Sequence, residues 1–137
     1  MFEADINYLA VVLAALVTQP LGFLWYGPLF SRPWMQARGY DEASMEGGDS
    51  PLPYVLALAF AAVIAYSMAR LVDMVGADSV GDCLAIAGFV WAGFAGSVQA
   101  IQMVFNQAES RTTAFAIEGG YQLTSFLAMG LIIGLFQ

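Results

Sequence analysis

The chain has 137 residues, of which 60% are hydrophobic and 11% charged, with a mean hydropathy of +0.71 and a formal net charge of −7. Soluble domains are nearer half apolar and a quarter charged, and a soluble domain this small needs polar residues to cover its surface, so the composition excludes that class and indicates a membrane protein. The negative charge excludes a nucleic-acid partner, because binding phosphates requires clusters of lysine and arginine.

Four long apolar stretches predict four transmembrane helices, at about residues 6–30, 54–75, 83–105 and 112–136. Each has the roughly 20 residues that cross a ~30 Å hydrocarbon core, and a helix satisfies its own backbone hydrogen bonds in lipid. The expected fold is therefore all-α: a single integral membrane four-helix bundle with short loops and both termini on the same side.

The first stretch is expected to remain as a helix and not to be removed as a signal peptide. It carries Glu3 and Asp5 in place of a positively charged start, and it is too long for a signal sequence. Trp25, Tyr26 and Trp34 bracket its far end, where amphipathic rings favour the membrane interface. Gly27 and Pro28 follow Tyr26 directly and predict a break in the helix.

The connections between the stretches predict the orientation. Residues 41–53 form an acidic, glycine-containing segment that suits a flexible linker. Arg32, Arg38 and Arg111 lie in the loops at residues 31–53 and 106–111, whereas Arg70 lies at the opposite end of the second stretch. The positive-inside rule therefore places these two loops in the cytoplasm and both termini outside.

Small residues recur at every fourth position, which places them on one face of each helix. Such faces let helix backbones approach closely in lipid and gain dispersion contacts. Two interpretations are open: packing within the bundle or, for the third stretch, contact between copies of the chain. Either predicts that Gly96→Leu disrupts folding or assembly, and normal migration on native gels would contradict it. The set comprises Ala57, Ala61 and Ala65, then Gly88, Ala92 and Gly96, and finally Gly130 and Gly134.

One segment carries a family resemblance. The run from Trp25 to Phe30 reads WYGPLF and is followed by Trp34 and Met35. It resembles the signature of DUF1761, a family of small bacterial membrane proteins of unknown function, and the resemblance extends over nearly the whole chain. It implies a compact four-helix protein of the bacterial inner membrane, and it supplies no activity and no catalytic residue.

Polar side chains within the apolar stretches are the candidates for a functional site, because they are costly to bury in hydrocarbon. They gather in the half nearest the arginine-bearing loops: Glu118, Gln122, Gln19, Gln99 and Gln102. These side chains hold the bundle together by hydrogen bonds, or they line a polar cavity around Glu118. Arg70 lies too far from Glu118 to pair with it and is expected to pair with Asp73, Glu3 or Asp5. Arg111, in the turn before the fourth stretch, could reach Glu118 only at full extension.

The residue types that the sequence lacks restrict the functional hypotheses. With no histidine, no lysine and the single cysteine Cys83, the sequence offers no recognisable catalytic or metal-binding set, and we expect no enzyme activity, cofactor or metal. The first hypothesis is a non-enzymatic membrane module in contact with lipid, either a homo-oligomer or a subunit of a larger membrane complex. The alternative is a minimal transporter or channel built around Glu118, which Glu118→Gln should inactivate without unfolding.

Overall fold

The computed structural model describes residues 6–39 and 51–137, and all regular secondary structure in these ranges is helical. Four helical segments of 22 to 26 residues are long and apolar enough to cross a membrane: Tyr8–Leu29, Leu52–Val75, Val80–Phe105 and Arg111–Leu135. At ~1.5 Å per residue, each exceeds the ~30 Å of a hydrocarbon core. The expectation of an all-helical bundle with four membrane-spanning helices is confirmed. Glu3, Asp5 and most of the predicted acidic linker lie outside the described residues.

The first span is continuous until it reaches the WYGPLF segment. Helix α1 (Tyr8–Leu24) begins at Asn7, whose side chain accepts a hydrogen bond from the Ala10 amide at 3.2 Å, and it continues through Pro20. It passes into a π-helical turn, η1 (Trp25–Leu29), in which Gly27 leaves helical geometry with φ −101° and ψ −105°. This confirms the predicted break at Gly27. The short helix α2 (Ser31–Arg38) then runs to Gly39, whose left-handed backbone (φ 73°) ends it.

Helix α4 (Leu52–Val75) forms the second span. It starts with prolines in its first turn, where a missing amide hydrogen costs nothing, and it ends at Gly76 in the left-handed conformation (φ 77°). The third span is made of α5 (Val80–Val90), a π-helical turn η2 (Trp91–Ala95) and α6 (Gly96–Phe105). Helix α7 (Arg111–Leu135) forms the fourth.

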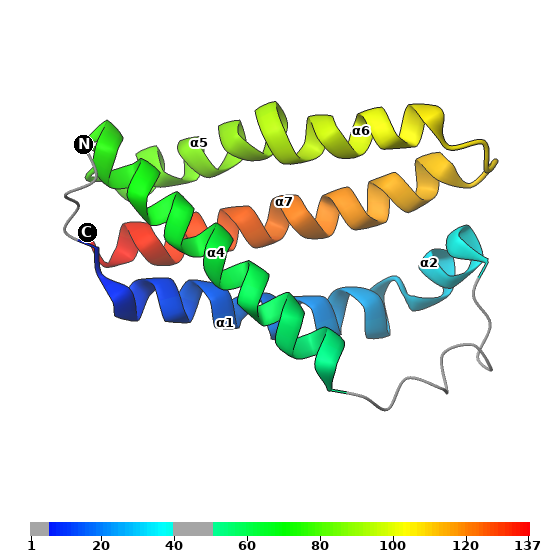
Figure 1. The fold of residues 1–137 in the computed structure, drawn as a ribbon, viewed down its shortest axis with the longest axis horizontal. Helices are drawn as coiled ribbons and strands as arrows, with labels where there is room; N and C mark the ends of the chain where they lie inside the picture. The colour runs from blue at the N-terminus through cyan, green and yellow to red at the C-terminus, as the bar shows by residue number, and fades with distance from the viewer. Residues whose placement is uncertain (1–5, 40–50) are drawn as a thin grey trace.

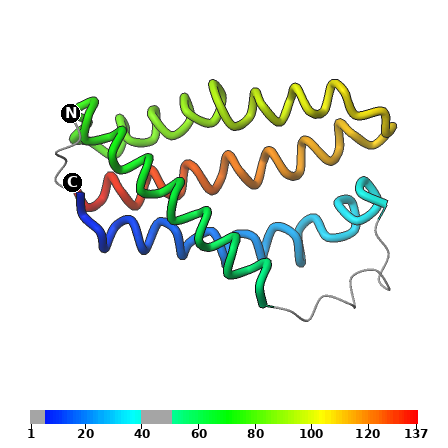
Figure 2. The backbone as a smooth tube through the Cα atoms, in the orientation of Figure 1, coloured from blue at the N-terminus to red at the C-terminus, as the bar shows by residue number. Residues whose placement is uncertain are grey.

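Helix α7 lies between α1 on one side and α5–α6 on the other, and α4 crosses α1 obliquely (Figure 1). The start of α1 and the end of α7 meet at one end of the bundle (Figure 2). The opposite end holds α2 and the turn from α6 to α7. Because α7 contacts every other span, its side chains reach both halves of the molecule.

The two ends of the bundle differ in chemistry. At the end where α7 finishes, the core is built from small and medium apolar side chains, and Ala14, Ala65, Val72, Cys83 and Ala87 are completely buried. Small side chains allow the helix axes to approach, which is how helices gain packing energy in lipid. The end at α2 instead collects aromatic and polar residues, and it is there that a site can be sought.

Glycines bring α5 and α7 into backbone contact. A Cβ added at Gly130 would lie 2.9 Å from both the Cys83 carbonyl oxygen and the Ala87 Cβ, and one added at Gly134 would lie 2.9 Å from the Val80 Cα. No side chain larger than hydrogen fits at either position. Ala61 and Ala65 are likewise buried in the core where α4 packs on α1.

The other small residues of the predicted stripes face elsewhere. Ala57 and Ala92 are exposed, and a Cβ added at Gly88 meets no atom within 4 Å. Gly96 contacts its own span, because a Cβ there would lie 3.0 Å from the Trp91 ring. Most of the third-span stripe therefore points away from the bundle.

Candidate functional site

Glu118 of α7 is the centre of a polar cluster at the α2 end. Its Oε1 accepts hydrogen bonds from Arg38 Nε at 2.7 Å and from Trp34 Nε1 at 3.2 Å, and its Oε2 forms an ion pair with Arg38 Nη2. The Arg38 guanidinium therefore binds both oxygens of the Glu118 carboxylate, and this bidentate arrangement is the strongest for such a pair. The Arg38 side chain is 40% exposed and that of Glu118 is 20% exposed, so the pair lies partly shielded at the edge of the bundle.

The sequence of the first span explains how these donors reach Glu118. The π-helical turn and Gly27 redirect the chain after α1, so that α2 lies against the first half of α7. Trp34 and Arg38 are four residues apart and share one face of α2. Gly39 ends α2 immediately after Arg38, which leaves the guanidinium at the free end of the helix.

Two further contacts fasten the same elements to α7. Trp25 Nε1 donates to the Ile117 carbonyl oxygen at 2.8 Å, and Ser110 Oγ donates to the Ala37 carbonyl oxygen at 2.5 Å. Gly120 makes room for the Trp25 ring, since an added Cβ would lie 3.1 Å from it. We call the contacts of Trp25, Trp34 and Arg38 with Ile117 and Glu118 the α2 clamp.

An aromatic cluster adjoins the α2 clamp on the side of α1. The Tyr26 ring packs edge-on against Trp34 and against Tyr121, with centroids 4.9 Å and 5.3 Å apart. Tyr121 OH donates to the Thr18 carbonyl oxygen at 2.9 Å, crossing from α7 to α1. The hydroxyl reaches that oxygen because Gly22 has no side chain: an added Cβ would lie 3.1 Å from it.

Glu118 also borders a small polar pocket of about 120 Å³ between α2, α6 and α7, hereafter the Glu118 pocket. Gln99 and Gln102 line it, as does Arg111, whose Nη1 donates to the Asn106 carbonyl oxygen at 2.8 Å. The structure thus brings together three of the five polar candidates from the sequence. The partner that it gives Glu118 is Arg38 instead of Arg111.

The other two polar candidates lie apart from this pocket. The Gln122 side-chain oxygen is buried without a hydrogen-bond partner among the described residues, as are Gln99 Oε1, Trp91 Nε1 and Ser125 Oγ. Gln19 lines a second cavity. At the far end of the bundle, the Arg70 guanidinium lies 5.8 Å from the centre of the Tyr66 ring.

The second cavity is larger, about 950 Å³, and lies between the last turns of α1 and the first turns of α4. We call it the α1–α4 cavity. Its walls are mostly apolar and aromatic, and the aromatic cluster forms one of them. Its lining includes Gln19, Phe23, Tyr26, Trp34, Tyr54 and Ala57.

Comparison with known families identifies the chain's relatives. The family model described as "Protein of unknown function (DUF1761)" matches residues 9–134. The chain belongs to the DUF1761 family. No curated protein and no solved structure matches this DUF1761 protein.

The WYGPLF segment of this DUF1761 protein acquires a structural meaning from the α2 clamp. Its first residue, Trp25, anchors α7, and its Gly27 supplies the turn that presents α2. Within residues 6–39 and 51–137, no group of three His, Cys, Asp or Glu residues is placed to hold a metal ion.

Sequence reasoning missed Arg38 as the partner of Glu118 and the bridge from Tyr121 to Thr18. The four-residue spacing of Trp34 and Arg38 was a usable signal, because it places an indole donor and a guanidinium on one helix face at the end of the bundle where Glu118 lies. The Tyr121 bridge had no such signal.

Proposed function

We propose that this DUF1761 protein is a non-enzymatic module of the bacterial inner membrane that works as a homo-oligomer. The contact between copies is the outer face of the third span. Of the two forms of membrane module, a homo-oligomer and a subunit of a larger complex, the exposed face of the third span favours the homo-oligomer.

The observation that carries the proposal is a row of small residues on the outside of the bundle, most of them exposed in the part of the chain that the structure describes. Gly81, Ala85, Gly88 and Ala92 are spaced four, three and four residues apart, so they share one face of α5 and η2. Gly81, Ala85 and Ala92 are exposed, and the space beside Gly88 is open. We call this row the outer stripe.

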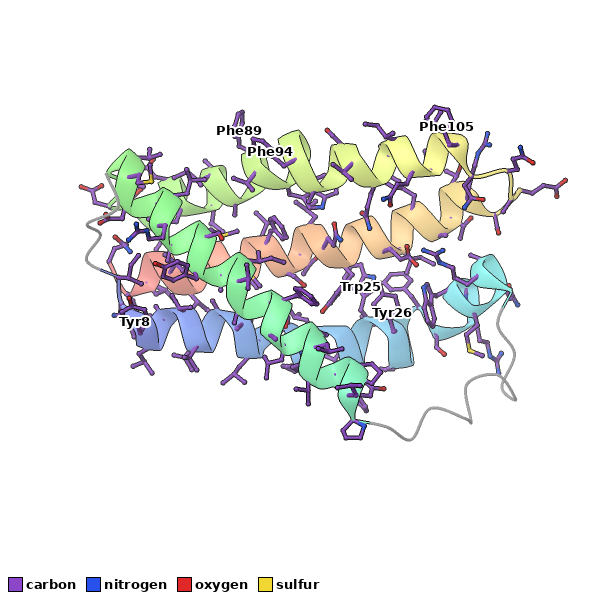
Figure 3. All side chains as sticks on the ribbon, viewed as in Figure 1. Tyr8, Trp25, Tyr26, Phe89, Phe94 and Phe105 are labelled. Carbon is purple, nitrogen blue, oxygen red and sulfur yellow. The ribbon has the colours of Figure 1, made fainter. Side chains whose placement is uncertain are left out.

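Large aromatic side chains are exposed on the same span as the outer stripe, and Phe89 follows Gly88 directly. Phe89 and Phe94 are 73% and 64% exposed, and Phe89 projects outward from the bundle (Figure 3). A shallow row of small residues beside large rings suits packing against another helix, because the backbones can approach while the rings fill the edges.

The polar residues support a structural role for the interior. Arg38 and Trp34 already hold Glu118, so its carboxylate fastens α2 to α7. A transporter or channel around Glu118 is the second candidate, and the Glu118 pocket is the observation that favours it. Glu118→Gln in proteoliposomes separates the two: a transporter loses flux while it stays folded, and an oligomeric module keeps its assembly.

The test of the homo-oligomer is native mass spectrometry of the protein extracted gently from its own membrane. The double variant Gly88→Leu, Ala92→Leu fills the outer stripe without a clash inside the chain and should be monomeric. Ala59→Leu, an exposed position on α4, is the matched control and should assemble like the wild type. A monomeric wild type or an unchanged double variant would contradict the proposal, and a stable heteromeric complex would assign an accessory role instead.

A further inference from the structure

The α1–α4 cavity has no role in the proposed function. Its volume of about 950 Å³ is at the upper end of the range for small-molecule sites, roughly 300–1,000 Å³. It lies mostly within the membrane-spanning segments, because its residues come from the second half of the first span, the start of the second and Tyr121 of the fourth, with Trp34 of α2 at its edge. A ligand would therefore reach it from the bilayer.

Three polar groups on the cavity wall have no hydrogen-bond partner among the described residues. They are the Gln19 amide and the hydroxyl groups of Tyr26 and Tyr54. The other polar groups of the wall already have partners: Tyr121 OH donates to the Thr18 carbonyl oxygen, Thr18 Oγ1 to the Ala15 carbonyl oxygen and Trp34 Nε1 to Glu118. Gln19 lies deepest of the three, near the middle of the first span, where an unpaired amide is costly, whereas Tyr26 and Tyr54 lie near the ends of their spans. A ligand that offers hydrogen-bond acceptors would be favoured there.

The charge of the wall restricts the ligand further. Among residues 6–39 and 51–137, no Asp, Glu, Lys or Arg lines the cavity, and the nearby Arg38 binds Glu118. A phosphate or carboxylate head group would enter without a counter-ion, which hydrocarbon surroundings penalise strongly. The site therefore favours a neutral polar group.

The residues around the polar side of the cavity favour a flat head group. Phe23, Tyr26, Trp34 and Tyr54 surround it with aromatic surface, and aromatic faces and edges gain most from another planar ring. Figure 3 shows Tyr26 beside Trp25 in the region between α1 and α7. The remaining apolar wall can hold a hydrocarbon tail.

From these observations we infer that the α1–α4 cavity binds a neutral membrane amphiphile whose head is a planar ring bearing carbonyl oxygens, the chemistry of an isoprenoid quinone. The Gln19 amide and the Tyr26 hydroxyl donate to the ring oxygens, and the tail lies along α1 and α4. This site is independent of the outer stripe, so it can be present or absent whatever the oligomeric state.

The probe is ubiquinone with two isoprene units, titrated into the full-length protein in phosphatidylcholine nanodiscs. Quenching of tryptophan fluorescence reports binding, because Trp34 lines the cavity. We expect saturable quenching in the wild type. Tyr26→Phe keeps the ring packing and removes only the hydroxyl, and combined with Gln19→Leu it should weaken binding about tenfold or more.

A second pair of variants guards against misfolding. Ala57→Phe projects a ring into the cavity and should abolish saturable quenching, whereas Ala59→Phe, exposed and outside the cavity, should not. Quenching that rises without saturation and equally in all variants means partition into the bilayer only and overturns the inference. Saturable displacement of the quinone by phosphatidylglycerol would overturn the neutral head group.

Discussion

The pair Arg38 and Glu118 holds two distant parts of the chain together through a single carboxylate. Arg38→Ala should lower the free energy of unfolding by about 2 kcal/mol, because the partly buried carboxylate loses its main partner. The double-mutant cycle with Glu118→Gln should give a coupling energy of about 1 kcal/mol. Equilibrium unfolding in mixed micelles measures both.

The control for this cycle is Arg32→Ala. Arg32 is exposed on the same short helix, and its loss should change the free energy of unfolding by less than about 0.5 kcal/mol. A cycle that gives no coupling would show that the contact of Arg38 with Glu118 contributes nothing to the fold.

Tyr121 tests the bridge from α7 to α1. Tyr121→Phe keeps the ring against Tyr26 and removes the hydrogen bond to the Thr18 carbonyl, so the expected loss of stability is about 0.6 kcal/mol. Gly22→Leu should cost more, because its side chain would displace the Tyr121 hydroxyl. If Gly22→Leu were harmless in the same unfolding assay, α1 and α7 would not approach as closely as described.

The sequence was informative about which residues were costly to bury and less informative about which of them meet. Glu118, Gln99 and Gln102 border one pocket because their depths along α6 and α7 are similar, and depth can be counted from sequence. Gln19 lies at a similar depth on α1 but on the other side of the bundle. Rotation of a helix about its axis depends on packing, which counting does not give.

At the scale of helices, the contact of α5 with α7 depends on glycine. Gly130→Leu should destabilise the protein by about 3 kcal/mol, because its side chain would collide with the Cys83 carbonyl oxygen and force the backbones apart. Thermal or denaturant unfolding in detergent measures the loss.

Gly88→Leu is the matched comparison, since it is also a glycine of the α5–α7 hairpin but has open space beside it. Its monomer stability should change by less than about 0.5 kcal/mol. Equal destabilisation by the two changes would mean that glycine acts here through helix propensity and not through close packing.

The four-residue spacing of small side chains places them on helix faces but does not say which partner each face meets. The stripe at Gly130 and Gly134 meets α5, whereas much of the third-span stripe meets nothing in the described chain. The turn η2 adds to the difficulty, because a π-helical turn shifts the register after Trp91 and changes which residues share a face.

For the whole molecule, the four spans could be read from hydropathy because lipid leaves a chain of this composition few alternatives to helices. Hydropathy could not predict the oblique path of α4 across α1, and therefore could not predict the α1–α4 cavity. Helix crossing depends on the fit of individual side chains, and no local pattern in residues 52–75 encodes it.

Orientation in the membrane is a prediction at this scale. Arg32, Arg38 and Arg111 lie toward the end opposite the C-terminus of α7, so that end should face the cytoplasm. After Cys83→Ala, Gln137→Cys should react with an impermeant maleimide in intact bacterial cells, and Thr112→Cys only after permeabilisation. The opposite labelling pattern would reverse the orientation.

The α2 clamp also bears on how the protein is made. Trp25 and Ile117 are 92 positions apart, and Arg38 and Glu118 are 80 apart. During synthesis, Trp25, Trp34 and Arg38 leave the ribosome long before Ile117 and Glu118 are made. Three earlier spans must therefore enter the membrane before α2 can dock. A chain whose translation stops before α7 lacks Ile117 and Glu118, so Trp25, Trp34 and Arg38 cannot make the contacts that fix α2 against α7. The undocked α2 then distinguishes an incomplete chain from a finished one.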